Sequence, residues 1–518
     1  MSNSSKTKME FNFSLSIITI FSFILFLTIF FRKITRSKPD PDSNLPPGPK
    51  KLPLIGNLHQ LATSSKLTHQ TLSDLAEKYG PVIHLQLGQI STIVISSAEA
   101  AKEIIKTHEL TFFNRPVNIA AEIIFYNHSD LAMSPYGEYW RQLRKFYTVE
   151  LLSAKRVQSF RALREQEFTN LCQWIASKEG LSIDLTEKIG FTTCDIVMQV
   201  SLGKKTDELR KFTTIANKCA KLASGFNIAD FYPSIGLFRR LSPTKDKLEK
   251  QHEAADRILE KLIDEHRSST KDESKQHEDF ADDLLKFNNS GNQIQLTDAN
   301  IKGILLEVFT AGIETSSMTT NWIMVEMLRQ PRVFKKAQDE VRMVFKDKGF
   351  VDESCFDELK YLKLVVKEGL RLHPGLPILF PRESTEQCEI FGYKIPPKTR
   401  VLVNAWAIGR DPKYWKEPNS FIPERFLDSP IDYKGNYFEY LPFGSGRRIC
   451  PGISFGLANI ELALALFLYH FDWALPDGMK PEDLDMAEAP GLTLNRKEPL
   501  YVIPRVKIPL RSRMVVSA

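Results

Sequence analysis

The stretch Phe443-Gly-Ser-Gly-Arg-Arg-Ile-Cys-Pro-Gly452 decides the fold of this chain. Its three glycines have no Cβ, so the backbone can turn tightly and come close to a flat ligand. Pro451 suits the first position of a helix, and the apolar residues after it favour a helix there. Cys450 would then lie at a helix N-terminus, where the partial positive charge lowers the pKa of a thiol and stabilises the thiolate. The segment therefore predicts a thiolate that binds iron beside a porphyrin.

The charge next to this cysteine and the pattern of the other cysteines agree with that prediction. Arg448 lies two residues before Cys450 and can pair with an acidic propionate of a porphyrin. The chain has six cysteines. No two of them form a C-x-x-C pair, which argues against a zinc site, an iron–sulfur cluster or a disulfide framework. We interpret the remaining cysteines as small buried hydrophobes. They are Cys172, Cys194, Cys219, Cys355 and Cys388.

A long apolar stretch from 296 to 330 predicts a single helix that crosses the domain. Thr297 can cap its start, and Pro331 follows its end. At 1.5 Å per residue the helix would be about 50 Å long. Its middle carries Ala-Gly-Ile-Glu-Thr-Ser at 311–316, where an acid and a hydroxyl interrupt the apolar pattern. Polar groups inside an apolar helix are costly unless they are satisfied, so this segment needs an explanation.

Two interpretations of this polar segment are open. In the first, Thr315 only bonds back to the carbonyl of Ala311 and bends the helix, which Gly312 makes easier. In the second, the same distortion opens a groove for O2, and Glu314 and Thr315 relay protons to oxygen bound at the iron.

Glu368-Gly-Leu-Arg371 places opposite charges on one face of a predicted helix. Such a pair is commonly a solvated surface bridge that contributes little to stability. The apolar residues around this pair predict instead that it is buried. Gly369 inside the motif would loosen the helix by about 1 kcal/mol relative to alanine.

Taken together, these segments resemble the signatures of the cytochrome P450 family. The likeness covers essentially the whole chain. It is strongest with plant A-type members (the 71 clan) that oxidise terpenoids, of the premnaspirodiene or casbene oxygenase kind. The stretches 140–145, 151–158 and 404–411 add to it. The resemblance implies a P450 fold, a haem b cofactor (iron protoporphyrin IX) and mono-oxygenase activity.

The resemblance also implies a role for each matching residue. Cys450 would be the iron ligand and the metal-binding residue. The residues expected around the porphyrin are Trp140, Arg144, Arg382, Arg448, Phe443, Gly444 and Gly452. Glu314 and Thr315 would be catalytic, and Glu368, Arg371 and Arg425 would form a structural network under the cysteine loop.

Substrate contacts are expected from the loop 112–134, the long helix, the segment after the E-x-x-R motif and the loop 490–493. The named candidates are Thr310, Ala311, Ile313, Leu376, Ile378, Leu379 and Leu492. These side chains are mostly apolar, so we expect a lipophilic small molecule. A terpenoid is the expectation by family analogy, and a plain core role is the alternative.

The N-terminal segment predicts a membrane anchor. Residues 11–31 are uncharged and apolar, and as a helix they would span a hydrocarbon core of about 30 Å. A cleaved signal peptide is the alternative, but it would have a shorter apolar region and a small-residue cleavage site. More basic residues follow the run than precede it, which places the body in the cytosol. We therefore predict a lumenal N-terminus (1–10), a single-pass anchor in the endoplasmic reticulum membrane, a basic and proline-rich hinge (32–50) and a catalytic domain (51–518).

The composition of the body is that of a folded globular protein. Hydrophobic residues make up 42% and charged residues 25% of 518, and the net charge of +6 does not point to nucleic acid. Residues 82–87 and 92–95 are strand-like, and 135–345 is mainly helical with a charged loop at 271–278. Prolines and short apolar runs at 374–403 predict strands and turns. We expect one mainly α domain with a small β region.

Electrons for a mono-oxygenase must come from elsewhere, because the sequence has no G-x-G-x-x-G nucleotide fingerprint. We expect NADPH–cytochrome P450 reductase as the partner, docked on a basic face with Arg141, Lys145 and Arg447. Two other classes stay open. One is a P450-fold isomerase or dehydratase that needs neither O2 nor a reductase, and the other is a non-catalytic haem-binding protein.

Overall fold

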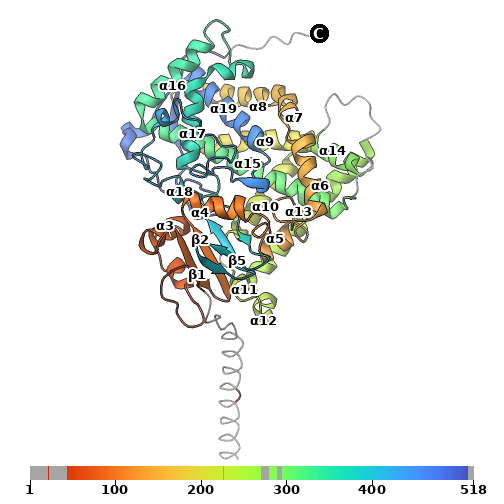
Figure 1. The fold of residues 1–518 in the computed structure, drawn as a ribbon. Coiled ribbons are helices and arrows are strands. Elements are labelled where there is room, and N and C mark those ends of the chain that lie inside the picture. The colour runs from red at the N-terminus through yellow and green to blue at the C-terminus, as the bar shows by residue number, and fades with distance from the viewer. Residues whose placement is uncertain (1–21, 23–43, 226, 270–278, 289–293, 511–518) are drawn as a thin grey trace, which may run out of the picture.

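The computed structural model describes Ser22 and residues 44–225, 227–269, 279–288 and 294–510. The predicted anchor, apart from Ser22, and the predicted charged loop 271–278 lie outside these ranges. Figure 1 shows a helical body joined to a smaller region that contains β1, β2 and β5. This arrangement confirms the predicted mainly α fold with a small β region.

Helices make up most of the described chain. The longer ones are α3 Thr68–Tyr79, α6 Glu138–Phe146, α8 Arg161–Ala176, α9 Leu185–Leu202, α10 Asp207–Ala223, α13 Pro243–Ser269, α14 Phe280–Phe287, α15 Asp298–Arg329, α16 Pro331–Val344, α17 Lys360–Leu372 and α19 Ile453–His470. The shorter ones are α2 Leu58–Ala62, α4 Ala98–Lys102, α5 Ile119–Ile124, α7 Ala154–Ser159, α11 Ile228–Phe231, α12 Gly236–Arg240 and α18 Ala405–Ile408. Single 3-10 turns include Pro423–Phe426 and Gly446–Arg448.

The strands bring together segments that are far apart in the chain. They are β1 Val82–Leu87, β2 Ile90–Ile95, β3 Ile183–Asp184, β4 Arg382–Glu383, β5 Cys388–Ile390, β6 Tyr393–Ile395, β7 Arg400–Val403, β8 Phe471–Ala474 and β9 Tyr501–Val506. The largest sheet has the order β1-β2-β7-β4, with β1 antiparallel and β7 parallel to β2. Strands β3, β9 and β8 form a second sheet, and β5 pairs with β6. The strands predicted at 82–87, 92–95 and within 374–403 are therefore confirmed.

Helix α15 lies in the middle of the helical body (Figure 1). The hydroxyl of Thr297 caps it by accepting a hydrogen bond of 3.2 Å from the backbone N–H of Asn300, as predicted. The helix ends at Arg329, and α16 begins at Pro331. It packs against α9, α17 and α19. This long buried helix supplies a rigid support for the polar segment at its centre.

Gly369 allows α17 to lie unusually close to α15. A Cβ added at Gly369 would lie 2.3 Å from Cγ1 of Ile323, a distance that no real contact permits. The predicted loosening of α17 by glycine is therefore outweighed here by the close packing that only glycine allows.

In the described part of the chain, one helix is long and apolar enough to cross a membrane. This helix is α19, with a mean hydropathy of 1.5 over 18 residues. However, 72% of that window is buried inside the domain, so α19 is a core helix.

Candidate active site

The cysteine loop folds into a tight turn ahead of α19. The backbone N–H of Cys450 donates to the carbonyl of Phe443 over 3.0 Å. Gly444 and Gly446 have φ values of +71° and +72°, a region that favours glycine. A Cβ on Gly446 would also lie 2.6 Å from a carboxylate oxygen of Glu109. The backbone conformation therefore favours glycine at both positions, and at 446 a larger residue would also displace the Glu109 side chain.

Two expectations about Cys450 need correction. Helix α19 begins at Ile453 with Gly452 as its N-cap, so Pro451 precedes the helix and does not occupy its first position. The pKa of the Cys450 thiol is raised, because burial disfavours the anion. The N–H of Gly452 and the positive charge of Arg144 act in the opposite direction, but burial outweighs both.

Arg448 is held by the segments before and after α5. Its guanidinium donates to the carbonyls of Phe113 (2.9 Å) and Ser134 (2.6 Å) and lies 4.3 Å above the ring of Phe113. Trp140 on α6 closes the same cluster, because its indole N–H donates to the carbonyl of Leu131 over 3.2 Å. In this structure both predicted propionate-binding residues therefore bond to backbone carbonyls of one loop.

Arg115, Arg382 and Arg448 lie near one another, and the pKa of each is lowered. Burial, together with the charges of Arg448 and Arg382, lowers the pKa of Arg115 well below its usual range. Burial and Arg382 lower the pKa of Arg448 to about 9, and burial lowers that of Arg382 to about 10. Buried like charges favour an anion between them, and the two propionates of haem provide such an anion. The residues present therefore fit a haem beside Cys450.

Arg115 is a member of this cluster that the sequence did not reveal. Its guanidinium donates to the carbonyls of Ala132 (3.0 Å), Phe380 (2.7 Å) and Pro381 (3.0 Å). It thereby links the loop after α5 to the segment before β4. No local pattern around Arg115 signals this role, because its partners are far away in the sequence.

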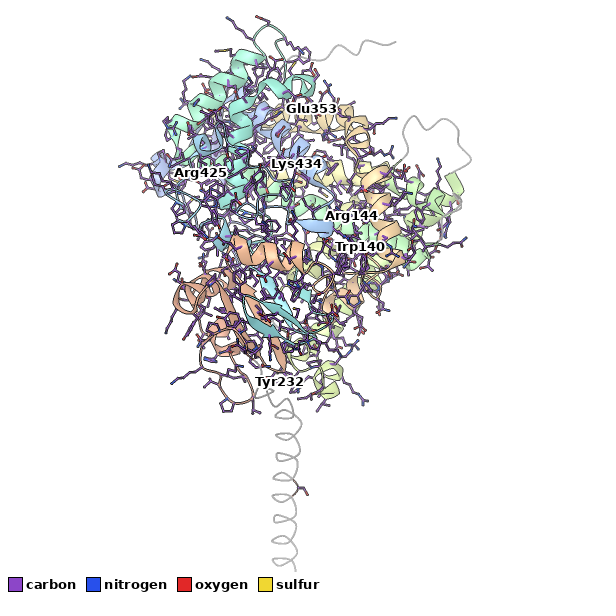
Figure 2. All side chains as sticks on the ribbon, viewed as in Figure 1. Trp140, Arg144, Tyr232, Glu353, Arg425 and Lys434 are labelled. Atoms are coloured by element: carbon purple, nitrogen blue, oxygen red, sulfur yellow. The ribbon has the colours of Figure 1, made fainter. Side chains whose placement is uncertain are left out.

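Figure 2 shows Trp140 and Arg144 next to each other on α6. Trp140 is buried, and Arg144 is partly exposed. Burial lowers the pKa of Arg144, and a negative charge at Cys450 would raise it. The predicted common face of these two residues thus points toward the cysteine loop.

A buried carboxylate on α15 fixes the loop that holds Arg448. The two oxygens of Glu307 accept hydrogen bonds from the backbone N–H groups of Leu131 (3.0 Å) and Ala132 (2.9 Å). The hydroxyl of Tyr147 donates to the same carboxylate over 2.7 Å. Burial raises the pKa of Glu307 and that of its neighbour Asp130. Sequence reasoning missed both acids.

The acid and the alcohol of α15 have different partners. The hydroxyl of Thr315 donates to the carbonyl of Ala311 over 2.6 Å, as the first interpretation expected, and the helix stays continuous through this turn. One oxygen of Glu314 accepts hydrogen bonds from Thr493 (2.7 Å) and Asn495 (2.6 Å). The acid is therefore tied to the C-terminal loop, a contact that the sequence did not predict.

Three of the four segments in which substrate contacts were predicted come together near Thr315. A Cβ on Gly375 would lie 3.9 Å from Cγ2 of Thr315. The backbone N–H of Leu494 donates to the carbonyl of Gly375, and the indole of Trp322 donates to the carbonyl of Leu494. The C-terminal loop, the segment before β4 and α15 are therefore joined at this point.

The named pocket residues differ in exposure. Ala311 and Leu492 are exposed, Ile313 is buried in the main core, and the rest are half-buried: Thr310, Leu376, Ile378 and Leu379. The hydroxyl of Thr310 donates to the carbonyl of Leu306 over 2.9 Å. Their contact with a substrate stays a prediction.

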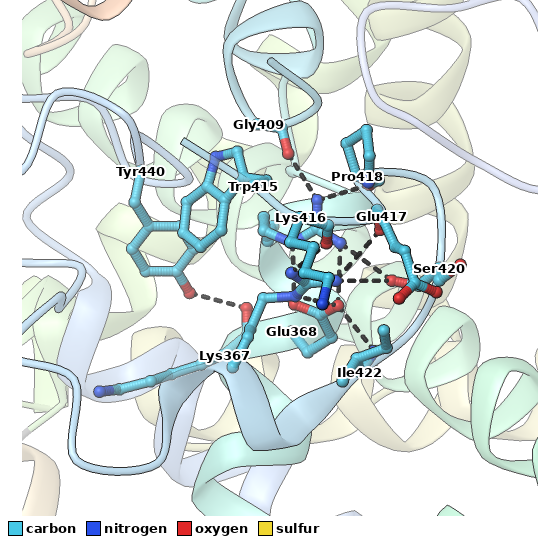
Figure 3. Close-up of polar contacts among 12 residues, drawn as sticks. Lys367, Glu368, Gly409, Trp415, Lys416, Glu417, Pro418, Ser420, Ile422 and Tyr440 are labelled. Atoms are coloured by element: carbon cyan, nitrogen blue, oxygen red, sulfur yellow. Dashed lines mark hydrogen bonds and ion pairs between the residues drawn. The ribbon is translucent and has the colours of Figure 1, made fainter. Parts of the chain in front are cut away.

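Figure 3 shows the charged network of the E-x-x-R motif. Arg371 forms two hydrogen bonds of 2.8 Å with the carboxylate of Glu368, and both side chains are fully buried. Arg425 donates to the same carboxylate over 2.9 Å. Arg371 also donates to the carbonyls of Gly409 and Pro418. The motif thus joins α17 to the chain between α18 and the turn at 423–426.

The three basic residues of the predicted docking face are exposed. Arg141 pairs with Glu138 over 2.6 Å, and Arg447 pairs with Glu109 over 3.2 Å. Both arginines contact Tyr136, which places them side by side. Each arginine is therefore partly neutralised by an acid of the chain.

A half-buried cysteine on a glycine turn, a cluster of buried and half-buried arginines and a long helix with an acid–alcohol pair define a haem-thiolate protein. The sequence matches the family model "Cytochrome P450" over residues 46–503. The chain therefore belongs to the cytochrome P450 family. It is a P450 enzyme of the mono-oxygenase type with haem as its cofactor.

Proteins of similar sequence come from plants and agree with the plant A-type resemblance. Cytochrome P450 71D11 from Lotus japonicus is 52% identical over 481 residues, covering 92% of this chain and 98% of the relative. Salviol synthase from Salvia pomifera is 48% identical over 492 residues, covering 95% and 98%. Tabersonine 6,7-epoxidase isoform 1 from Catharanthus roseus is 47% identical over 496 residues, covering 94% and 97%.

A solved structure of a zebra fish cytochrome P450 with progesterone has the same fold. Its TM-score to this chain is 0.73 at 24% sequence identity, covering 84% of this chain and 99% of that one. This likeness confirms the predicted P450 fold.

Proposed function

We propose that this P450 hydroxylates or otherwise oxidises a lipophilic plant specialised metabolite, a terpenoid of the sesquiterpene or diterpene class. The reaction would use O2 and electrons from NADPH–cytochrome P450 reductase. The body would face the cytosol on a single-pass anchor in the endoplasmic reticulum membrane. The observation that carries the proposal is the acid–alcohol pair on α15 beside Gly375, where the apolar candidate segments meet.

When bound, haem would supply O2 activation, with electron density donated by its cysteine ligand. Cys450 would be that ligand, and Gly444, Gly452 and Phe443 belong to the turn that presents it. The propionates would be held by Arg144, Arg382, Arg448 and Trp140. Arg115 adds a further buried positive charge to this group.

The remaining residues position groups or move protons. Glu307 fixes the loop whose carbonyls bind Arg448. The network of Glu368, Arg371 and Arg425 would stabilise the chain around the cysteine loop. Glu314 and Thr315 would hold and pass protons on the oxygen side of the site. Half-buried leucine and isoleucine side chains would exclude water and favour a lipophilic substrate.

The substrate class rests on the family resemblance and on a relative named salviol synthase. A relative of nearly equal identity is named for epoxidation of tabersonine, so identity alone leaves several substrate classes open. The direct test is incubation of the full-length enzyme with reductase, NADPH and a panel of sesquiterpenes, diterpenes and alkaloids, followed by product analysis. We expect NADPH-dependent oxygenated products from a terpene. Turnover without NADPH would point instead to an isomerase or a dehydratase.

A further inference from the structure

The carboxylate of Glu314, a member of the predicted relay, also belongs to a three-residue polar cluster with Thr493 and Asn495. Its Oε1 accepts hydrogen bonds from Thr493 Oγ1 (2.7 Å) and Asn495 Nδ2 (2.6 Å). Asn495 Nδ2 also lies 3.0 Å from the hydroxyl of Thr493. Both hydrogen bonds to the carboxylate go to the same oxygen, Oε1. Because an amide does not titrate near neutral pH, Asn495 can orient Glu314 but cannot itself act as an acid or a base.

A small cavity lies beyond Asn495. Its volume is about 120 Å³, and its lining includes Thr186, Ser317, Asn321, Asn495, Lys497 and Glu498. A water molecule occupies about 30 Å³ in the liquid, so on the order of four waters would fit. Most of these lining side chains are polar, which favours water over an apolar occupant.

A buried amide in the wall of this cavity needs a partner. Asn321 is 4% exposed, and among the described residues its Oδ1 has no hydrogen-bond partner. A buried polar oxygen is normally satisfied by protein or by ordered water, and this one belongs to a residue that lines the cavity. The unpaired oxygen therefore gives independent support for water inside.

The cavity is lined both by exposed residues and by the residue that binds Glu314. Ser317 and Asn321 follow Glu314 by three and seven residues, so all three lie along one side of α15. Lys497 and Glu498 also line the cavity and are exposed to solvent. Asn495 lines the cavity and also bonds to Glu314, so it lies where the water would meet the carboxylate.

We infer that this cavity is the proton inlet of the site and that Asn495 is the positioning residue that holds Glu314 at its inner end. This inference rests on the proposed mono-oxygenase function. Each turnover of that reaction joins one oxygen atom of O2 to the substrate and reduces the other to water, which consumes two electrons from NADPH and two protons. Each proton passes from cavity water to the Glu314 carboxylate and then to Thr315, and solvent replaces it. Glu314 and Thr315 end each cycle unchanged.

The test uses full-length enzyme with reductase and compares three variants. Asn495→Leu removes the hydrogen bond to Glu314, and Asn321→Leu fills the cavity without touching Glu314. The matched control is Asn459→Leu on α19. Asn459 is also a buried helical asparagine without a protein partner among the described residues, but it does not line the cavity.

We expect Asn495→Leu and Asn321→Leu to lower the product formed per NADPH by roughly tenfold, since positioned proton transfer contributes at least that much. The solvent deuterium isotope effect on kcat should rise, and KM should stay unchanged. The control should behave as wild type in all three measurements. Unchanged product yield and isotope effect in both cavity variants would overturn the inference.

Infrared spectroscopy tests whether Asn495 positions Glu314, and it does not require the enzyme to turn over substrate. The infrared carboxyl band that Glu314→Gln removes should shift in Asn495→Leu and stay in place in Asn459→Leu. An unshifted band in Asn495→Leu would refute the positioning role. If wild-type enzyme forms no product with NADPH, the proposed function fails, and this band still tests the contact between Asn495 and Glu314.

Discussion

Arg371 and Glu368 share two hydrogen bonds of 2.8 Å, and neither side chain is exposed to solvent. The pair is costly to bury, but its remaining donors reach backbone carbonyls and its carboxylate also accepts from Arg425. Because each buried charge in the group depends on its partners, the network is sensitive to the loss of any one member.

Removing one partner of this network should therefore destabilise the fold. We expect Glu368→Ala to cost about 3–5 kcal/mol of unfolding free energy, since it leaves the charge of Arg371 buried and uncompensated. Urea unfolding followed by circular dichroism measures this. The control is Glu138→Ala, which breaks the exposed pair with Arg141 and should change nothing measurable. Equal stability of the two variants would show that the network does not support the fold.

Gly369→Ala should destabilise the protein although alanine is the better helix former. The intrinsic gain is about 1 kcal/mol, but the new Cβ would lie 2.3 Å from Cγ1 of Ile323. Overpacking of this kind costs about 1–3 kcal/mol. Thermal unfolding should show a lower Tm for Gly369→Ala and a partial recovery when Ile323→Val is added. A higher Tm for the single variant would mean that α17 and α15 are less closely packed than described.

The unfolding free energy should decrease as the pH is lowered below neutral, because His84 becomes protonated. This residue is buried in β1, and burial together with the charge of Lys51 lowers its pKa from 6.5 to about 4. The unfolded state therefore binds a proton first as the pH falls. Stability contributed by neutral His84 is present above about pH 6.5 and is lost toward pH 4.

The measurement is the difference in unfolding free energy between wild type and His84→Gln across this pH range. In wild type, titration of His84 should make the unfolding free energy change by at most about 1.4 kcal/mol per pH unit. Glutamine does not titrate, so the variant should lack this contribution. Parallel curves for the two proteins would contradict the assignment.

Electron transfer through the predicted docking face should depend most on Lys145. Arg141 and Arg447 are already paired with Glu138 and Glu109, whereas no ion pair joins Lys145 to the part of the chain that the structure describes. We expect Lys145→Glu to slow electron transfer from reductase more than Arg141→Glu does. The difference should shrink as salt screens the charges. Stopped-flow reduction at several ionic strengths measures this, and rates that do not respond to charge reversal would refute the docking face.

Features that depend on neighbouring residues could be predicted from the sequence. The cap at Thr297, the strands β1 and β2 and the glycine turn before Cys450 follow from local chemistry, because the residues that decide them lie within a few positions. The burial of the E-x-x-R pair followed from its apolar neighbours.

Features that depend on distant segments could not be predicted. Arg115 acquires its place from carbonyls about 265 residues away, and Asn495 meets Glu314 across 181 residues. The raised pKa of Cys450 was missed for the same reason, since burial comes from the whole fold, whereas the expected helix effect is local. From the sequence, Gly369 was expected only to loosen α17. The structure shows that Ile323 packs so closely against it that a Cβ would not fit.

Carbon monoxide binding to the reduced, haem-loaded enzyme tests the central claim most directly. If Cys450 is the iron ligand, the wild-type spectrum should show the red-shifted Soret band of a thiolate-ligated ferrous haem. Cys450→Ser should lose that band while circular dichroism shows that the protein is still folded. A folded, haem-loaded wild type without the red-shifted band would contradict the claim.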